Sequence, residues 1–189
     1  MEIIESYLTE SACFLEGDTI EVKGLMLHSV GCAYQQPFYF MEKWNHPDCQ
    51  EACVHAFIDG TDGKIYQTLP WNHRAWHCGG SYNGTHIGVE MCEPACLSYT
   101  SQFGFTCENR EEALACAKLT YDTAVELFAW LCRKYGLDPL ADGVIVSHYE
   151  GYLRAAASDH EDPEHFWQGL GTGYTMDGFR RDVKAAMQA

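Results

Sequence analysis

Short runs of hydrophobic residues bounded by glycine, asparagine and aspartate recur along the chain and predict β-strands. The run GLMLHSV, which follows a glycine, is mostly apolar, as is typical of a buried strand. Two other runs flank Asp62-Gly63, a dipeptide that favours a tight turn, so they predict a hairpin. The predicted strands cover residues 24–30, 52–59, 64–70, 86–93 and 143–148.

A second periodicity, of three to four residues, predicts helices. The longest covers about 110–135, with Asn109 and Glu112 as a capping pair and Gly136 as its stop. Shorter helices are expected at 37–44 and in the tail MDGFRRDVKAAMQ. This order of elements predicts an α/β fold with a mixed central β-sheet flanked by helices. Neither a repeat nor a linker divides the 189 residues, so we expect one domain, 1–189.

The overall charge excludes some classes of partner. A formal net charge of -15 repels phosphate backbones, so we expect no nucleic-acid binding. No apolar run approaches the roughly 20 residues that cross a bilayer, so we expect no membrane insertion. The opening MEIIESYLTE lacks the positive charge and apolar core of a signal peptide, which predicts synthesis in the cytoplasm without export by that route. The oligomeric state stays open.

The chain has ten cysteines, which we interpret as reduced thiols because disulfide frameworks are typical of short secreted chains with small cores. Cys116 and Cys132 lie on the apolar side of the long predicted helix, where they act as small hydrophobic residues. The pairs Cys49/Cys53 and Cys92/Cys96 have wider spacing than the Cys-x-x-Cys of most zinc sites, so a metal there is not favoured.

Two histidines close predicted strands and are candidate metal ligands. His28 follows LML and His148 follows VIVS, so both are expected at the same edge of the sheet. Two neutral imidazoles and one carboxylate suit a catalytic zinc that keeps a position open for water. The residue pattern alone leaves the third ligand open among Glu150, Asp159, His160, Glu161, Asp162, Glu164 and His165.

Glu90 lies within the apolar strand IGVEMCEP, where an unpaired carboxylate is costly to bury. Three interpretations of this glutamate are open. Its side chain faces water, it pairs with Arg74, or it has a raised pKa beside a metal ion and serves in proton transfer. Alternation places it on the face opposite Ile87, Val89 and Met91. The pattern does not decide among these alternatives.

Five segments together resemble one known family. They are LMLHSVG, VHAFIDGTDGKIYQTLPWNHRAWHCG, HIGVEMCEP, VSHYEGYLRAAASDHEDPEHFW and the tail that follows. In this order they resemble the zinc-dependent N-acetylmuramoyl-L-alanine amidases of the type 2 family, which includes peptidoglycan recognition proteins. The closing stretch is similar to amidases and prophage endolysins of clostridia. The resemblance runs from about residue 20 to the C-terminus and implies the fold of that family.

The resemblance implies roles for individual residues. His28, His148 and Asp162, which precedes Pro163 as the family's third ligand precedes a proline, would hold Zn²⁺. Glu90 matches the family's general base, and His160 occupies the position of a residue that stabilises the transition state. The gap of fourteen residues from His148 to Asp162 is longer than usual, so Asp159 and His160 stay rival ligands.

Another departure concerns a tyrosine that phage-type enzymes use in catalysis, because Val54, before His55, occupies its place here. Trp76 and His77 are expected to border a substrate groove, although a turn anchored by a buried tryptophan explains them equally well. His46, His73, His86 and His165 are expected to be bystanders.

The expected activity is hydrolysis of the amide bond between N-acetylmuramic acid and L-alanine in peptidoglycan. Such an enzyme would act on the cell wall, in a phage or a housekeeping role. The alternatives are a muropeptide-binding module of the same fold that does not catalyse, and a zinc hydrolase of another amide.

Overall fold

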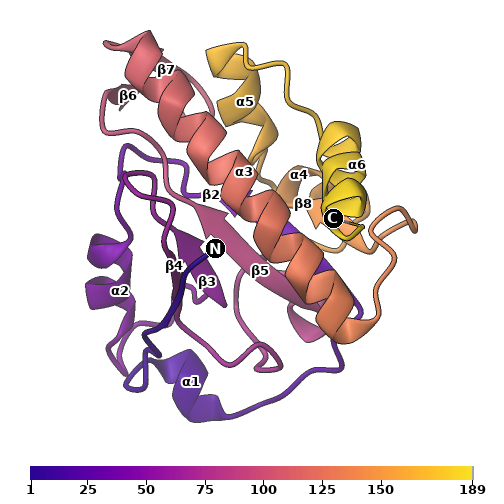
Figure 1. The fold of residues 1–189 in the computed structure, drawn as a ribbon. Coiled ribbons are helices and arrows are strands. Elements are labelled where there is room, and N and C mark those ends of the chain that lie inside the picture. Colours follow the sequence, from indigo (N-terminus) through magenta and orange to yellow (C-terminus); the bar gives the residue numbers. More distant parts are fainter. Residues whose placement is uncertain (189) are drawn as a thin grey trace.

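A six-stranded mixed β-sheet forms the centre of the computed structural model, which describes residues 1–188. Its strand order is β1-β4-β3-β5-β2-β8, and β6 and β7 form a separate two-stranded sheet (Figure 1). The strands are β1 (Ile3–Glu5), β2 (Gly24–Ser29), β3 (Ala56–Ile58), β4 (Ile65–Gln67), β5 (His86–Met91), β6 (Leu97–Tyr99), β7 (Phe105–Cys107) and β8 (Ile145–Ser147).

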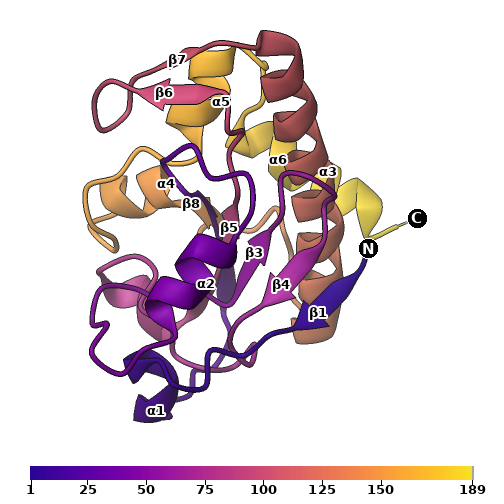
Figure 2. The same ribbon diagram turned by 90° about the vertical axis from the view of Figure 1, so that its left-hand side faces the viewer.

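Helices lie on both faces of the sheet. They are α1 (Ala12–Glu16), α2 (Phe38–Trp44), the 3₁₀ turn η1 (Ser81–Gly84), α3 (Arg110–Tyr135), α4 (His148–Leu153), α5 (Glu164–Leu170) and α6 (Met176–Ala186). The long α3 crosses one face with α5 and α6 beside it, while α2 and α4 lie on the opposite side (Figure 2). The predicted α/β fold with a mixed, helix-flanked sheet is confirmed.

Alternation along the central strands divides their side chains between the two faces. Leu25 and Leu27 of β2, with Val89 of β5, belong to the main core beneath α3 and are fully buried. The residues at the alternate positions of these strands, including His28 and Glu90, therefore point to the face that α2 and α4 flank. On that face Phe57 stacks with Phe40 of α2 at 5.5 Å between ring centroids. One face of the sheet thus supplies the core and the other supplies the site.

The long helix α3 has the bounds that the sequence predicts. The Asn109 side chain accepts from the backbone N–H of Glu112, and Gly136 ends the helix with a positive φ of 67°. That left-handed conformation is the one glycine adopts without strain. Helix α3 packs on α5, α6 and the sheet, so it fixes the C-terminal third of the chain against the strands.

Several elements differ from the prediction. Strand β8 is shorter than expected, because Ser147 and Glu150 form a capping box that starts α4 at His148. Strands β1, β6 and β7, of three residues each, were not predicted. Helices α1 and α5, of five and seven residues, were also missed.

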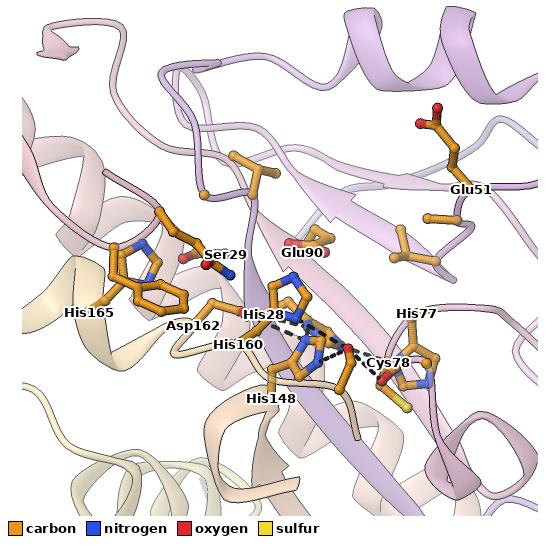
Figure 3. Close-up of a pocket in the computed structure, with 18 of the residues that line it drawn as sticks. His28, Ser29, Glu51, His77, Cys78, Glu90, His148, His160, Asp162 and His165 are labelled. Atoms are coloured by element: carbon orange, nitrogen blue, oxygen red, sulfur yellow. Dashed lines mark hydrogen bonds and ion pairs between the residues drawn. The ribbon is translucent and has the colours of Figure 1, made fainter. Parts of the chain in front are cut away.

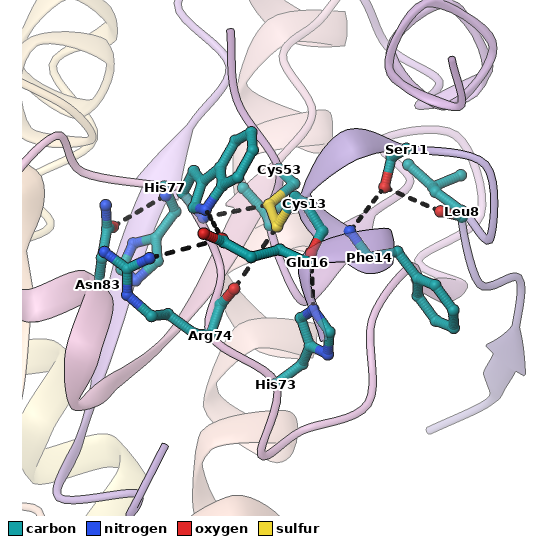
Figure 4. Close-up of a disulfide and its surroundings, with 12 residues drawn as sticks. Leu8, Ser11, Cys13, Phe14, Glu16, Cys53, His73, Arg74, His77 and Asn83 are labelled. Atoms are coloured by element: carbon teal, nitrogen blue, oxygen red, sulfur yellow. Dashed lines mark hydrogen bonds and ion pairs between the residues drawn. A yellow bond between two sulfur atoms is a disulfide. The ribbon is translucent and has the colours of Figure 1, made fainter. Parts of the chain in front are cut away.

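The expectation that all cysteines are reduced is wrong for two of them. Cys13 of α1 and Cys53, in the loop before β3, form a disulfide that ties the two segments together (Figure 4). His73 contacts the same segment through its Nε2, 2.9 Å from the carbonyl oxygen of Cys13. The sequence separation of 40 residues gives no pairing signal. Cys116 and Cys132 are buried free thiols, as predicted.

Within residues 1–188, none of the helices combines the length and the apolar character that crossing a membrane requires.

Substitution of a core residue in α3 should lower stability far more than substitution of an exposed residue in the same helix. Phe128 is fully buried and meets Phe179 of α6 edge to face at 5.1 Å. Phe128→Ala should cost about 3–5 kcal/mol of unfolding free energy, whereas Lys118→Ala, on the exposed side, should change it by less than about 0.5 kcal/mol. Urea unfolding followed by circular dichroism measures both, and equal effects would contradict the assigned packing.

Candidate metal centre and active site

Parallel strand pairing brings three candidate residues to one level of the sheet. Strand β2 lies between β5 and β8 and is parallel to both. In the register, His28 is directly opposite Glu90, and Leu27 is opposite Ser147, the residue before His148. Because the capping box ends β8 at that point, His148 starts α4 at the level of His28. The sheet therefore presents Glu90, His28 and His148 in a row across its carboxyl edge.

Asp162 joins this row from the loop between α4 and α5. One of its carboxylate oxygens, Oδ2, lies 3.0 Å from His28 Nδ1, and Oδ1 lies 3.5 Å from His148 Nδ1. The two Nδ1 atoms are 3.1 Å apart. Figure 3 shows the three side chains pointing toward one another beneath the pocket. The ligand atoms all lie within 4.8 Å of one another, and all three residues are buried.

This donor set fits a divalent metal ion. Two imidazole nitrogens and one carboxylate oxygen are ligands that zinc accepts in catalytic sites, where three protein ligands leave one position open. Of the potential ligand groups in residues 1–188, this is the one cluster of three with metal-binding geometry. Asp159 and His160, the rival third ligands, lie outside it. The cluster can therefore hold a metal ion.

The pKa shifts of the three residues reflect their burial and the charges they exert on one another. Burial opposes a charge on His28, yet the hydrogen bond to Asp162 and the charges of Glu90 and Asp162 raise the pKa of His28 above its ordinary value. Burial and then the charge of His28 lower the pKa of His148 to about 3. Burial acts to raise the pKa of Asp162, but His28 and the other histidines bring it below its usual range.

Glu90 lies beside this cluster and lines the pocket. It is partly exposed, but its Oε2 is buried and has no hydrogen-bond partner in the described part of the chain. Burial first, and then the charges of Asp162 and Glu93, raise the pKa of Glu90 to about 8, although His28 acts against them. The alternative pairing with Arg74 is wrong, because Arg74 lies 3.6 Å from Glu16.

Each histidine of the cluster has a second contact behind it. His28 Nε2 lies 3.0 Å from His77 Nδ1, and His77 Nε2 lies 3.1 Å from the carbonyl oxygen of His86. His148 Nε2 lies 3.2 Å from Ser158 Oγ, which is also 3.2 Å from His160 Nδ1. Both ring nitrogens of His77 are thus occupied inside the protein. Its expected role at a substrate groove stays a prediction, as does that of Trp76.

The cluster opens into a cavity of about 540 Å³. Trp76, Val54 and Glu51 line one part of it, and the β6–β7 hairpin contributes Tyr99 and residues 101–103 to the wall. Trp76 Nε1 donates to Glu16, 3.0 Å away, so the indole is held in place. His160, an exposed side chain, also lines the pocket, where the predicted catalytic role would require it.

A buried acid that contacts the pocket wall through Tyr99 and Gly31 was missed in the sequence. Glu93 is fully buried, and its carboxylate accepts from the Tyr99 hydroxyl and from the backbone N–H of Gly31. His165 Nε2 lies 2.9 Å from the same hydroxyl, so this histidine is a structural part of the pocket wall. The signal was present in GVEMCEP, where a second glutamate follows Glu90 by three residues.

An α/β fold with a buried His-His-Asp cluster at the carboxyl edge of its sheet, open to a pocket, defines a candidate metal-dependent enzyme. Residues 18–165 match the N-acetylmuramoyl-L-alanine amidase family, and the chain belongs to it. The resemblance to the N-acetylmuramoyl-L-alanine amidase family, inferred from the five sequence motifs, is confirmed. A relative, the N-acetylmuramoyl-L-alanine amidase XlyA of Bacillus subtilis (strain 168), is 48% identical over 44 residues, which are 22% of this chain and 14% of the relative.

Solved structures share the fold over almost the whole chain. The Staphylococcus aureus hydrolase AmiA, in complex with its ligand, superposes with a TM-score of 0.72 at 19% identity, covering 99% of this chain and 83% of that one. The catalytic domain of XlyA gives a TM-score of 0.67 at 22% identity, covering 97% of this chain and 99% of that one. At these identities the likeness concerns the fold.

The buried carboxyl group of Glu93 should make stability depend on pH. Burial raises the pKa of Glu93 to about 7 from an ordinary value of 4.5, although hydrogen bonds to the carboxylate act against it. The folded state then holds a proton that the unfolded state releases, so stability falls as the pH rises from 4.5 to 7. Replacement by Gln should remove this fall, a difference of about 3 kcal/mol between the two pH limits.

Urea unfolding of the wild type and of Glu93→Gln across that pH range measures the difference. Glu51→Gln, a change at an exposed pocket-lining carboxylate, is the control and should follow the wild-type curve. Parallel curves for the wild type and Glu93→Gln would contradict the assigned burial of the charge.

Proposed function

We propose that the chain is a zinc-dependent N-acetylmuramoyl-L-alanine amidase, which hydrolyses the amide bond between N-acetylmuramic acid and the L-alanine of the stem peptide. The observation that carries the proposal is the His28, His148 and Asp162 cluster with Glu90 beside it at the base of an open pocket. Family membership over residues 18–165 supports peptidoglycan as the substrate. The cell wall is then the site of action.

In this proposal His28, His148 and Asp162 hold the zinc ion. Zinc bound there would supply Lewis acidity, polarising the carbonyl of the scissile amide and making a water molecule more acidic. Two neutral imidazoles and one carboxylate leave the centre a net positive charge, which this chemistry requires. The three side chains come from rigid elements or their ends, so their positions do not depend on substrate.

Glu90 is the general base and acid in this proposal. Its buried Oε2 has no hydrogen-bond partner among residues 1–188, so it is free to accept a proton from the attacking water. The same carboxyl then passes that proton to the nitrogen of the departing L-alanine. Its pKa, raised to about 8 by burial, suits a group that must both take and release a proton near neutral pH.

His160 and Trp76 have supporting roles in the proposal. Ser158 Oγ contacts His160 through Nδ1, and a proton on the other ring nitrogen, Nε2, would be donated to the oxygen that becomes negative in the transition state. Trp76 presents an indole at the pocket wall, and a flat aromatic surface of this kind suits contact with a sugar ring.

A binding module without activity is the second candidate function, because a related fold can hold a muropeptide without cleaving it. The complete ligand cluster and the unpartnered oxygen of Glu90 favour catalysis, since binding alone needs neither.

The proposal is tested by incubating the purified protein with peptidoglycan and with soluble muropeptides and following the products by mass spectrometry. Release of stem peptides with a free N-terminal alanine, lost on chelation and restored by zinc, supports it. Binding of muropeptide without cleavage in the presence of zinc would favour the module. Cleavage of other acylated amides alone would favour a different amide substrate.

Removing the proposed proton-transfer group should separate turnover from metal binding. Glu90→Gln keeps the size of the side chain but cannot take a proton, so turnover should fall by roughly 100-fold or more while zinc content stays at the wild-type level. Glu51→Gln changes another carboxylate of the same pocket and should leave turnover unchanged. Rates on soluble muropeptide together with metal analysis give both values, and normal turnover by Glu90→Gln would rule out the role.

A further inference from the structure

His77 contacts the rear of the candidate metal centre. Its side chain is buried, and its ring meets that of His28 nearly at right angles, with centroids 5.2 Å apart. The Nδ1 atom of His77 lies 3.0 Å from His28 Nε2, the nitrogen that faces away from Asp162. In Figure 3 His77 lies on the far side of His28 from Asp162. The ring is therefore placed to act on His28 and not on Asp162.

Hydrogen-bond chemistry assigns a direction to these contacts. The carbonyl oxygen of His86 can only accept, so His77 Nε2, 3.1 Å away, carries the proton. A neutral His77 then has a lone pair on Nδ1, which accepts from His28 Nε2–H. His28 thus keeps a proton on the rear nitrogen, while its Nδ1, which donates to the Asp162 carboxylate here, is the nitrogen whose proton a metal ion would replace. With Nε2 protonated, loss of the Nδ1 proton leaves the tautomer that a metal ligand needs.

The surrounding chain fixes His77 in this orientation. The side-chain oxygen of Asn83 accepts from the backbone N–H groups of His77 and Cys78, both at 2.9 Å, which locks the turn. Gly88 of β5 leaves the space for the ring, since a Cβ there would lie 2.4 Å from His77 Cγ. A glycine in this buried strand is therefore explained by the histidine that packs on it.

We propose that His77 is a positioning residue that holds His28, through a histidine–histidine hydrogen bond ending at the His86 carbonyl, in the tautomer whose Nδ1 binds the metal ion. The role rests on the proposed metal centre. Most ligand histidines use a carboxylate, a carbonyl or a water for this purpose, and here a second imidazole connects the ligand to a backbone carbonyl.

Two substitutions separate positioning from packing. His77→Phe keeps an aromatic ring in the space beside Gly88 but offers no acceptor to His28. His77→Asn gives up the ring but can place an amide oxygen where Nδ1 stood. Neither variant donates from the Nε2 position to the His86 carbonyl, so that loss is common to both. Zinc affinity is measured by competition with a chromophoric chelator, and thermal unfolding is measured in parallel.

If His77 positions His28, zinc affinity should fall roughly 10- to 100-fold in His77→Phe and stay close to the wild-type value in His77→Asn. A purely structural role predicts the reverse order, because the phenylalanine preserves packing better. Wild-type affinity in His77→Phe, or an equal loss in both variants, would overturn the proposal.

A measurement on the metal-free protein keeps the test independent of zinc and of activity. Long-range ¹H–¹⁵N correlation spectra report which ring nitrogen of His28 carries a proton. We expect a slowly exchanging proton on Nε2 in the wild type and in His77→Asn, and loss of its protection in His77→Phe. An Nε2 without a proton in the wild type would overturn the assignment. If the protein bound no zinc, the proposed function would fail, whereas these spectra would still test the hydrogen bond.

Discussion

The register of three parallel strands is the constraint on which the candidate site depends. Strands β5, β2 and β8 are paired so that Glu90, His28 and the start of α4 lie at the same level. Backbone hydrogen bonds on both sides of β2 fix this alignment, and a shift by one residue would turn His28 into the core beneath α3. The capping box at Ser147 completes the row by ending β8 where His148 is needed. The positions of Glu90, His28 and His148 are therefore set by the sheet, and the loop between α4 and α5 adds Asp162.

The site gathers several metal-ligand atoms around one point, which is unfavourable for the folded protein without a bound cation. Two imidazole nitrogens face each other at 3.1 Å next to a carboxylate, and a further glutamate lies close by. The carboxylates of Asp162 and Glu90 attract a positive charge at the centre, as their effect in raising the pKa of His28 indicates. A cation that binds the folded chain and not the unfolded one would therefore also stabilise it. Stability and the proposed catalysis have the same physical origin.

Much of the fold could be predicted from the sequence because its main elements are long or have a clear hydrophobic periodicity. The 26 residues of α3 have a capping residue, an apolar stripe and a terminal glycine, so both of its ends were predicted. Short elements carried no such signal, and β6 and β7 became visible only through their pairing. The Cys13–Cys53 disulfide depends on a contact between distant segments, which no local pattern encodes.

In the site, the positions of His28 and His148 at the ends of predicted strands indicated that the two residues lie close together. The family resemblance then selected Asp162 as the third metal ligand from seven candidates. The sequence did not indicate how His77 is used, because its partner, His28, lies 49 residues away. Glu93 was overlooked since its burial depends on Tyr99 from the later hairpin. Local patterns therefore identified the residues on the sheet edge, while their supporting contacts required the three-dimensional structure.

The central claim is that three side chains distant in sequence form one metal-binding centre. Anomalous diffraction from crystals of the protein grown with zinc, recorded on both sides of the zinc absorption edge, tests it most directly. The account predicts one strong peak about 2.0–2.2 Å from Nδ1 of His28, Nδ1 of His148 and a carboxylate oxygen of Asp162. No peak at this position, or a peak bound by other residues while these three stay as they are, would contradict it.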